Sequence, residues 1–434
     1  MRNLSHLPHT LQNLLTVQAR QAGFSSGFVQ RRSKLTAEIF VQSLTFGWLA
    51  NPSASLQQLA QTASVCGADL SPQALDQRFT QASAACLKQV LEAAVAQVIT
   101  ADPVALPVLR RFTSVELIDS SIICLPDALL PVWRGCGGTR GQSSSLKVEL
   151  GLELLTGRLS GPHLHDGRTA DCKGILQHRR LAPGSLRIAD LAYFKLESLQ
   201  ELSAQPVYWI SRLKTATGLL DQQGKAWRLL ELIRAQKRDR IEVEIKLGRK
   251  EQIACRLIAV RVSEVVAAER RRRMRDKARR NCRPLKKESL ALADWTILIT
   301  NVEAEKLSLQ EVLVVARARW QIELLFKLWK SHGQIDAWRS QKPWRILTEL
   351  YAKLLAMLIQ HWVLVVGGWG EADKSLMKAS KGVQMLALHL AAAMGSIKAL
   401  TEAIKLIGKC IARRCRVEKR KKVPSSFQLL LNEP

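Results

Sequence analysis

Three acidic residues lie in largely apolar segments of the sequence, where a carboxylate needs a positively charged partner. Asp119 falls within the apolar, β-branched run FTSVELIDSSIICL, Asp190 ends the run SLRIAD, and Glu323 lies in the apolar and basic segment ARARWQIELLFKLWK. A carboxylate that leaves water must be paired with a positive protein group or a metal ion. Three convergent carboxylates could hold two divalent ions for an in-line phosphoryl transfer. Oxygen ligands of this kind favour Mg²⁺, and Mn²⁺ could replace it.

Two cations accompany Glu323. On a helix with about 100° per residue, Arg319, Glu323 and Lys330 fall within roughly 40° of one another. A single helix from Ala316 to Lys330 would therefore place all three side chains on one face. A guanidinium and an ammonium beside a carboxylate suit phosphate binding. The spacing alone fits equally well an amphipathic helix with a surface ion pair.

The elements that must position these acids follow from the hydrophobic pattern. Apolar and β-branched runs predict five strands, at residues 112–125, 147–157, 158–168, 185–194 and 206–214. Helices are predicted at 171–181 and 195–205. This order indicates an α/β domain with a mixed sheet. Asp119 and Asp190 can meet if the first and fourth strands are neighbours.

The first hundred residues have a helical pattern. We expect helices beginning near Thr36, at Ser55 with a capping box to Gln58, and at Ser71 followed by Pro72. Two short helices joined by a turn containing glycine suggest a helix-turn-helix motif, in which Gln73, Gln77 and Arg78 could face DNA. A plain helical bundle explains the same pattern.

The charge balance indicates an anionic partner. Lys and Arg number 65 against 37 Asp and Glu, a formal charge of +28, and nucleic acid is the default partner for such a chain. Residues 270–287 hold eleven basic residues and one acid. We expect an exposed arm or loop there that contacts phosphates, with a merely solvated helix as the alternative. A second basic cluster, 413–422, is either a DNA-contacting tail or a disordered end.

Other features bound the class of protein. The nine cysteines form no CxxC pair, and their irregular spacing suits a reducing compartment. The N-terminal sequence lacks a continuous apolar segment, so no secretion signal is expected. The apolar stretch 350–369 contains Lys353 and His361 and is expected to be a core helix rather than a membrane span. His163 and His165, beside Asp166, are expected to be surface residues rather than metal ligands.

Together these segments resemble a known family. Arg319, Glu323 and Lys330 match the R, E and K of the Y-x2-R-x3-E-x6-K signature found in one branch of the DDE transposases of bacterial insertion sequences, with Ala316 at the Tyr position. IDSS at 118–121 and ADLAYF at 189–194 resemble the segments that bear the first and second catalytic Asp. DWTILITNV resembles the strand that closes the family's β insertion. The resemblance covers nearly the whole chain.

The resemblance implies a domain organisation and a site. It implies an RNase H-like catalytic domain at 106–345, interrupted at about 215–305 by a β-rich insertion with a basic arm. A helical DNA-binding domain (1–105) would precede it, and a helical C-terminal region (346–434) would follow. Asp119, Asp190 and Glu323 would be the catalytic metal ligands. The DNA contacts that the resemblance implies are Arg319, Lys330 and Trp295, the last either stacking on a flipped base or packed in the core. Further predicted DNA contacts are Lys327, Arg212 and, from the basic run, Arg271, Arg272 and Arg273.

The resulting hypothesis is a transposase that binds terminal inverted repeats and target DNA as a homodimer. It would cut and join DNA strands with divalent metal ions. We expect it in the bacterial cytoplasm, on the nucleoid when it is bound to DNA, and we expect no membrane association. The alternative is an inverted-repeat DNA-binding protein without catalysis, a hypothesis that depends on Ala316. A nuclease that cuts without joining is a third interpretation.

Overall fold

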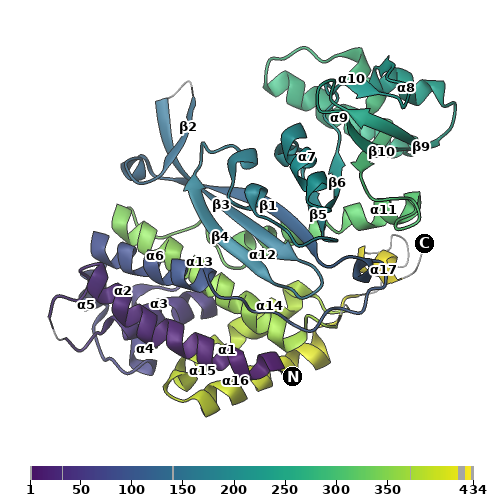
Figure 1. Cartoon of the computed structure of the whole chain (residues 1–434). Coiled ribbons are helices and arrows are strands. Elements are labelled where there is room, and N and C mark those ends of the chain that lie inside the picture. The colour runs from purple at the N-terminus through teal and green to yellow at the C-terminus, as the bar shows by residue number, and fades with distance from the viewer. Residues whose placement is uncertain (1, 32, 139–140, 372, 419–425, 432–434) are drawn as a thin grey trace. The chain divides into compact units, whose positions relative to one another are not determined.

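The structure is a computed structural model that describes residues 2–31, 33–138, 141–371, 373–418 and 426–431 (Figure 1). The chain divides into two compact units. The first, called here the helical unit, comprises Met1–Leu106, Asp119–Ala170 and Trp320–Phe427. The second, called the sheet unit, comprises Pro107–Ile118, Asp171–Arg319 and Gln428–Pro434.

The helical unit is built from the two ends of the chain. Its N-terminal helices are α1 (Arg2–Asn13), α2 (Ala19–Ser25), α3 (Ala37–Ala50), α4 (Leu56–Val65), α5 (Pro72–Asp76) and α6 (Gln81–Val95), with a π-helical turn η1 (Leu14–Gln18). Its later helices are α12 (Trp320–Ser331), α13 (Pro343–Gly368), α14 (Leu376–Met385), α15 (Ala387–Ala392) and α16 (Ile397–Arg414). The helix α17 (Ser426–Leu431) straddles the division between the units.

The predicted helix starts in this unit are confirmed. Thr36 and Ser71 accept hydrogen bonds from Ile39 N and Ala74 N. Ser55 forms the full capping box with Gln58. These caps satisfy amide groups that have no partner within the helix, so the sequence defines where α3, α4 and α5 begin.

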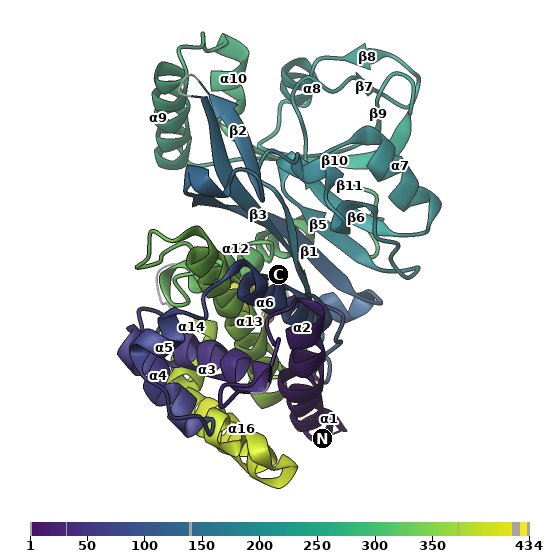
Figure 2. The same cartoon turned by 90° about the vertical axis from the view of Figure 1, so that its left-hand side faces the viewer.

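Helix α13 is the core of the helical unit. It packs against α3, α6 and α16 (Figures 1 and 2). By length and composition it could cross a membrane, but 89% of its most apolar window is buried inside the protein. Its buried Lys353 pairs with Glu349 at 2.7 Å and also donates to the carbonyl of Ala337. The prediction of a core helix is therefore confirmed.

The strand β1 (Val115–Leu125) belongs to both units, because the division falls between Ile118 and Asp119. In the helical unit the strand order is β2-β3-β1, and β4 pairs with β3. These strands are β2 (Arg134–Gly138), β3 (Gly141–Glu153) and β4 (Leu159–Asp166). The pairs β2–β3 and β3–β4 are antiparallel.

In the sheet unit the strand order is β1-β5-β6-β11-β10-β9-β7-β8. Strands β1, β5 (Leu186–Ala189) and β6 (Tyr208–Arg212) are parallel. The remaining strands pair antiparallel: β7 (Leu219–Leu220), β8 (Ala226–Trp227), β9 (Arg240–Leu247), β10 (Ile253–Arg261) and β11 (Trp295–Thr300). The helices are α7 (Leu196–Ala204), α8 (Leu229–Ala235), α9 (Glu264–Arg280), α10 (Lys287–Leu292) and α11 (Leu309–Arg317).

The predicted α/β class with a mixed sheet and flanking helices is confirmed, but the helix predicted at 171–181 is wrong. That segment forms two 3₁₀ turns, η4 (Asp171–Lys173) and η5 (Leu176–His178). The carbonyls of Leu176, Gln177 and Arg179 accept hydrogen bonds from the buried Arg187 guanidinium instead of from helical amides. A tertiary contact thus replaces the hydrogen bonds that would have continued a helix.

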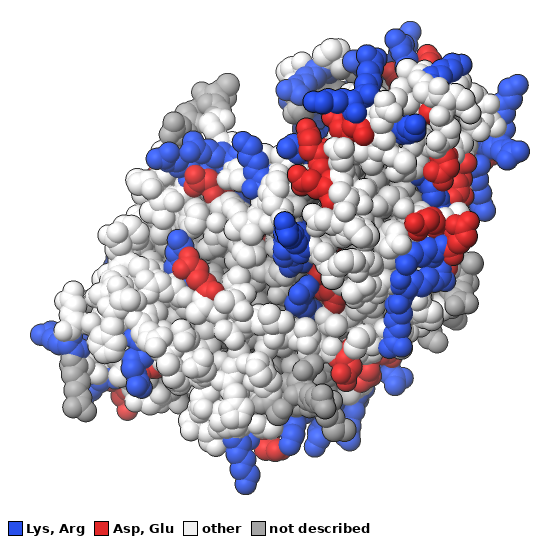
Figure 3. All heavy atoms as spheres, viewed as in Figure 1, with Lys and Arg blue, Asp and Glu red and all other residues white. Residues whose placement is uncertain are grey.

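The arm or loop predicted at 270–287 is wrong for the residues up to Arg280, which belong to the helix α9, the alternative conformation considered for this run; the residues between α9 and α10 form no helix or strand. Glu264, Glu269 and Asp294 form ion pairs with Arg271, Arg272 and Arg273 and reduce the repulsion that argued against order. The basic character survives: Lys and Arg side chains gather over the part of the sheet unit that holds α8, α9 and α10 (Figure 3).

Candidate active site

The pairing of β1 with β5 places the first two acids. The two strands are parallel, and Ile118 pairs with Ala189. Asp119 and Asp190 are the next residues along these two strand directions. Because side chains alternate along a strand, Asp119 follows the face of Leu117, and Asp190 follows that of Ile188. Both acids are half-buried, which leaves a side chain accessible to a ligand.

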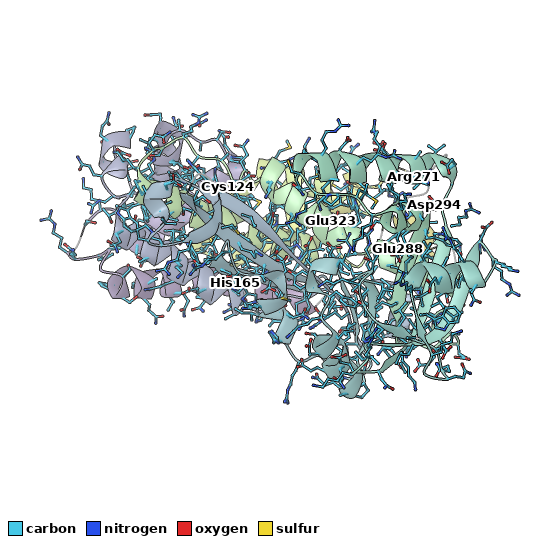
Figure 4. All side chains as sticks on the ribbon, turned by 90° about the horizontal axis from the view of Figure 1, so that it is seen from above. Cys124, His165, Arg271, Glu288, Asp294 and Glu323 are labelled. Carbon is cyan, nitrogen blue, oxygen red and sulfur yellow. The ribbon has the colours of Figure 1, made fainter. Side chains whose placement is uncertain are left out.

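Glu323 and Lys330 both project from α12 in the helical unit. The buried residues Ile322, Leu325 and Trp329 anchor this helix. Lys330 Nζ donates to the carbonyl oxygen of Ile122 at 3.0 Å, which ties α12 to β1 three residues beyond Asp119. Glu323 lies in the first turn of the helix, where the positive end of the helix dipole favours a carboxylate (Figure 4).

The single helix predicted from Ala316 to Lys330 is wrong. Helix α11 ends at Arg317, and α12 begins at Trp320. The amides of Ala318 and Arg319 turn back to the carbonyls of Val315 and Ala316, the short hydrogen bonds of a helix end. Arg319 therefore lies in the turn before α12, and only Glu323 and Lys330 share that helix.

A polar network, which was not predicted from the sequence, surrounds the two strands that lead to Asp119 and Asp190. Glu116 on β1 pairs in register with Arg187 on β5, three residues before Asp119 and Asp190, respectively. Glu116 Oε2 accepts from Arg179 Nη2 at 2.7 Å. Arg187 donates to three carbonyls of the 3₁₀ segment. A charged residue in the middle of each strand was the signal in the sequence.

The same network reaches the turn that follows Asp190. Gln177 Nε2 donates to the carbonyl of Tyr193 at 3.3 Å, and Tyr193 ends the 3₁₀ turn η6 (Leu191–Tyr193). Tyr193 and Leu176 pack with Ile118 in a small core cluster. Because these residues hold the backbone on both sides of Asp190, we expect them to fix the direction of its side chain.

The other predicted DNA contacts differ in how exposed their side chains are. Lys327 on α12 and Arg212 at the end of β6 are exposed. Trp295, at the start of β11, is half-buried and packs against the core of the sheet unit. Its carbonyl accepts from Arg270 Nη1 at 2.9 Å. Burial and the neighbouring Arg212 charge lower the pKa of Arg270.

The three arginines predicted at 271–273 all form ion pairs. Arg271 forms ion pairs with Asp294 (Figure 4) and with Glu264, and its side chain is 21% exposed. Arg272 and Arg273 share Glu269, each at 2.8 Å, and their hydrogen bonds lower the pKa of that carboxyl. The side chains of Arg272 and Arg273 are 71% and 78% exposed and can still reach a ligand, whereas Arg271 is less exposed and pairs with two carboxylates.

The histidines near Asp166 make contacts within the sheet of the helical unit. His165 Nε2 lies 3.1 Å from Glu149 Oε2, and Asp166 Oδ1 accepts from the amide of Arg134. Among the residues that the structure describes, no three His, Cys, Asp or Glu side chains are grouped as metal ligands. The half-buried acids that follow Ile118 and Ala189 nevertheless supply oxygen donors of the type that hard divalent cations bind.

The sheet is mixed, and Asp119 and Asp190 directly follow the paired residues Ile118 and Ala189. Comparisons with known proteins agree with this fold. The model of the transposase DDE domain family matches residues 110–359, which is more than half of the chain, so the protein belongs to this family. The matched range contains Asp119, Asp190 and Glu323.

Individual relatives match over most of their length. The transposase for insertion sequence element IS231F of Bacillus thuringiensis subsp. israelensis is 26% identical over 88% of this chain and 84% of the relative. The transposase for IS231C of Bacillus thuringiensis subsp. berliner is 27% identical over 81% of this chain and 77% of its own. The transposase for IS1151 of Clostridium perfringens is 26% identical over 78% and 76%.

These matches confirm the predicted family and class of enzyme. The protein is a DDE transposase of the insertion-sequence type, an enzyme that acts on DNA. The DDE domain is a divalent-metal domain, so the oxygen donors described above agree in kind with the cofactor that the family uses.

Proposed function

We propose that this transposase binds the inverted-repeat ends of its mobile element and performs divalent-metal-dependent strand cleavage and strand transfer. The observation that carries the proposal is the parallel register of Ile118 with Ala189, which makes Asp119 and Asp190 neighbouring strand positions. The Lys330 hydrogen bond to Ile122 supports the proximity of α12, and with it Glu323, to the same strand. Two strand acids and a helix acid form the donor set of a two-metal site.

In this proposal Asp119, Asp190 and Glu323 hold Mg²⁺, for which Mn²⁺ can substitute. When bound, the two ions supply Lewis acidity to the attacking and leaving oxygens of an in-line displacement at a phosphodiester. The chain's own cations bind and orient the DNA backbone. Lys330 uses one of its three donors on Ile122, so its ammonium keeps others for a phosphate. Arg319 in the turn and the exposed Lys327 would contact neighbouring phosphates.

The finer organisation is also a proposal. The shared strand β1 joins β4-β3-β1 with β1-β5-β6, which supports an RNase H-like domain at 106–345. The insertion at about 215–305 would carry Arg212, Trp295 and the basic helix to DNA. The helical domain at 1–105 would bind DNA, and residues 346–434 would form the helical C-terminal region. Within its basic cluster at 413–422, residues 419–422 lie outside the described part of the chain. We further propose that the protein belongs to the branch of the family with the Y-x2-R-x3-E-x6-K signature. It would act as a homodimer on paired transposon ends, in the bacterial cytoplasm.

Replacement of Glu323 tests the mechanism. Glu323→Gln keeps the shape of the side chain but removes the charge of a metal ligand. We expect strand cleavage of DNA carrying both ends of the element to fall by at least about 100-fold, since loss of an outer-shell partner alone costs up to that much. DNA binding should persist. The matched control is Glu305→Gln, the same chemical change at an exposed position. Full cleavage by Glu323→Gln would contradict the assignment.

The alternative is an inverted-repeat DNA-binding protein without catalysis. The observation that favours it is Ala316, which occupies the position of the signature Tyr near the end of α11 and lacks a hydroxyl for a phosphate. Binding to the inverted repeats without any metal-dependent cleavage product would establish this alternative. Cleaved but never joined products, in the presence of target DNA, would establish a nuclease instead.

A further inference from the structure

The basic helix α9 has two faces with different environments. Ala267, Arg271, Met274 and Ala278 recur at helical spacing and are buried or half-buried. On the opposite side Val265 is 81% exposed, and the charged residues from 272 onward follow it at helical spacing. One face of α9 is therefore packed on the sheet unit, and the other is open to solvent.

The arginines at the start of the basic run serve the packed face. Arg270 donates to the carbonyl of Trp295 at 2.9 Å and to the hydroxyl of Thr296 at 3.0 Å. Arg271 bridges Glu264 within the helix and Asp294 just before β11. These two guanidinium groups fasten α9 to β11, so their donors are already used by the protein.

The next two arginines are partly neutralised. Arg272 and Arg273 both form ion pairs with Glu269 one turn earlier. Two exposed cations that share one carboxylate leave a small net charge, and exposed pairs of this kind contribute little to stability. The first four arginines of the run thus all have protein partners.

From Arg275 onward the pattern changes. Seven exposed cations follow with the single acid Asp276 among them: Arg275, Lys277, Arg279, Arg280, Arg283, Lys286 and Lys287. Within the part of the chain that the structure describes, no ion pair joins any of these seven to a carboxylate. These seven exposed residues follow one another from the second half of α9 to the start of α10, and are called here the distal cation surface (Figures 1 and 2).

We propose that the distal cation surface binds the phosphate backbone of duplex DNA, and that Arg270 and Arg271 hold its helix in place without touching DNA. The proposal rests on the proposed DNA transaction and deepens it. In this proposal the DNA contacts of the basic run begin at Arg275, and Arg271 is not one of them. Unpaired, solvated cations on a fixed helix release counterions when they bind phosphates, and they carry no information about base sequence. The surface would therefore hold DNA of any sequence.

A salt titration of DNA binding tests the proposal. Binding of the full chain to a labelled duplex of arbitrary sequence is measured by fluorescence anisotropy in EDTA, between about 50 and 200 mM KCl. For the triple variant Arg275→Gln, Arg279→Gln, Arg280→Gln we expect the slope of log K against log [KCl] to become shallower by about three, since each lost phosphate contact contributes about 0.9. Glutamine retains good helix propensity, and circular dichroism verifies that α9 persists.

The matched control removes three charges elsewhere. It combines three substitutions at exposed positions of α14 and α16, namely Lys381→Gln, Lys398→Gln and Lys409→Gln. We expect this control to change the slope by less than about one, because these positions lose no phosphate contact. Equal changes in the two triple variants would overturn the assignment of the surface.

Two single variants separate the faces of the helix. Arg279→Gln should make the slope shallower by about one and leave the thermal midpoint unchanged. Arg271→Gln should lower the thermal midpoint and leave the slope unchanged. A slope change in Arg271→Gln as large as that in Arg279→Gln would overturn the division between anchoring and binding arginines. Because EDTA prevents metal-dependent turnover, these results do not depend on whether Glu323 is catalytic.

Discussion

Lys330 shows how a single side chain acquires a role from its surroundings. Its ammonium donates to the carbonyl of Ile122 on the strand that bears Asp119. The sequence predicted a phosphate contact for Lys330 and gave no reason for this second function. Because Lys has three donors and a flexible stem, one hydrogen bond to the backbone is compatible with a phosphate contact. Lys330 would therefore position α12 as well as bind DNA.

His361 on α13 leads to a prediction about acid stability. Its side chain is 1% exposed, and its Nε2 lies 2.7 Å from the carbonyl of Gly157. Burial lowers the pKa of His361 from 6.5 to about 4. Since the fold favours the neutral ring, this contribution to stability is complete above pH 6.5 and is lost as the pH falls from 6.5 through 4.

The expected loss between pH 7 and pH 4 is about 3 kcal/mol, from about 1.4 kcal/mol per pKa unit. Urea unfolding at the two pH values measures it in the wild type and in His361→Gln, whose amide does not titrate. The control His389→Gln removes an exposed histidine. If His361→Gln and the wild type lost stability equally on acidification, the neutral buried ring would not be responsible.

At the scale of elements, the 3₁₀ segment behind β5 explains how the strand that ends at Asp190 is supported. Arg187 is 4% exposed and supplies donors to three carbonyls of that segment. Removal of these donors leaves buried acceptors unsatisfied, at about 1–3 kcal/mol each. We predict that Arg187→Met lowers the free energy of unfolding by about 3 kcal/mol or more, as measured in urea, and weakens strand cleavage.

The comparison variant for this prediction is Arg168→Met. Arg168 is 54% exposed, and its Nε lies 3.7 Å from Asp166 Oδ2, a surface ion pair that contributes less than about 1 kcal/mol. Arg187→Lys, which keeps the charge but not the forked donors, should restore part of the stability. A cost for Arg187→Met as small as that for Arg168→Met would mean that the carbonyls find other partners.

At the scale of the whole molecule, the strand β1 runs through both compact units. It leaves the sheet unit at Ile118 and enters the helical unit at Asp119, so the first acid stands at the division.

The proposed homodimer leads to a measurable stoichiometry. If one protein copy acts on each end of the element, a complex with both ends contains two copies, so its protein mass should be twice the 48.5 kDa of the chain. Light scattering coupled to size exclusion measures this mass with a DNA fragment that carries paired ends and, as a control, with one that carries a single end. One protein copy on paired ends would contradict the homodimer.

Much of the fold could be predicted because it depends on local patterns. The capped starts of α3, α4 and α5, the strands β1, β4 and β6, and the apolar helix α13 each follow from capping residues or hydrophobic periodicity in one short segment. The family resemblance added the candidate acids and their order. The failure at 171–181 follows from hydrogen bonds with Arg187, and the failure within 270–287 follows from ion pairs with Glu264, Glu269 and Asp294, which hydrophobic periodicity does not reveal. The break before Trp320 is different, because it is made by short local hydrogen bonds that the apolar pattern does not mark.

The sequence by itself determined the mixed α/β class, the positions of the three acids and the cationic character of the protein. Only the tertiary structure decided that Ile118 and Ala189 are paired, because strand register depends on how the two faces of a sheet are covered. It also decided which arginines of α9 are anchors and which are open to solvent. A guanidinium can pair with a carboxylate of its own chain or with a phosphate, and the position of the neighbouring acids in space selects between them.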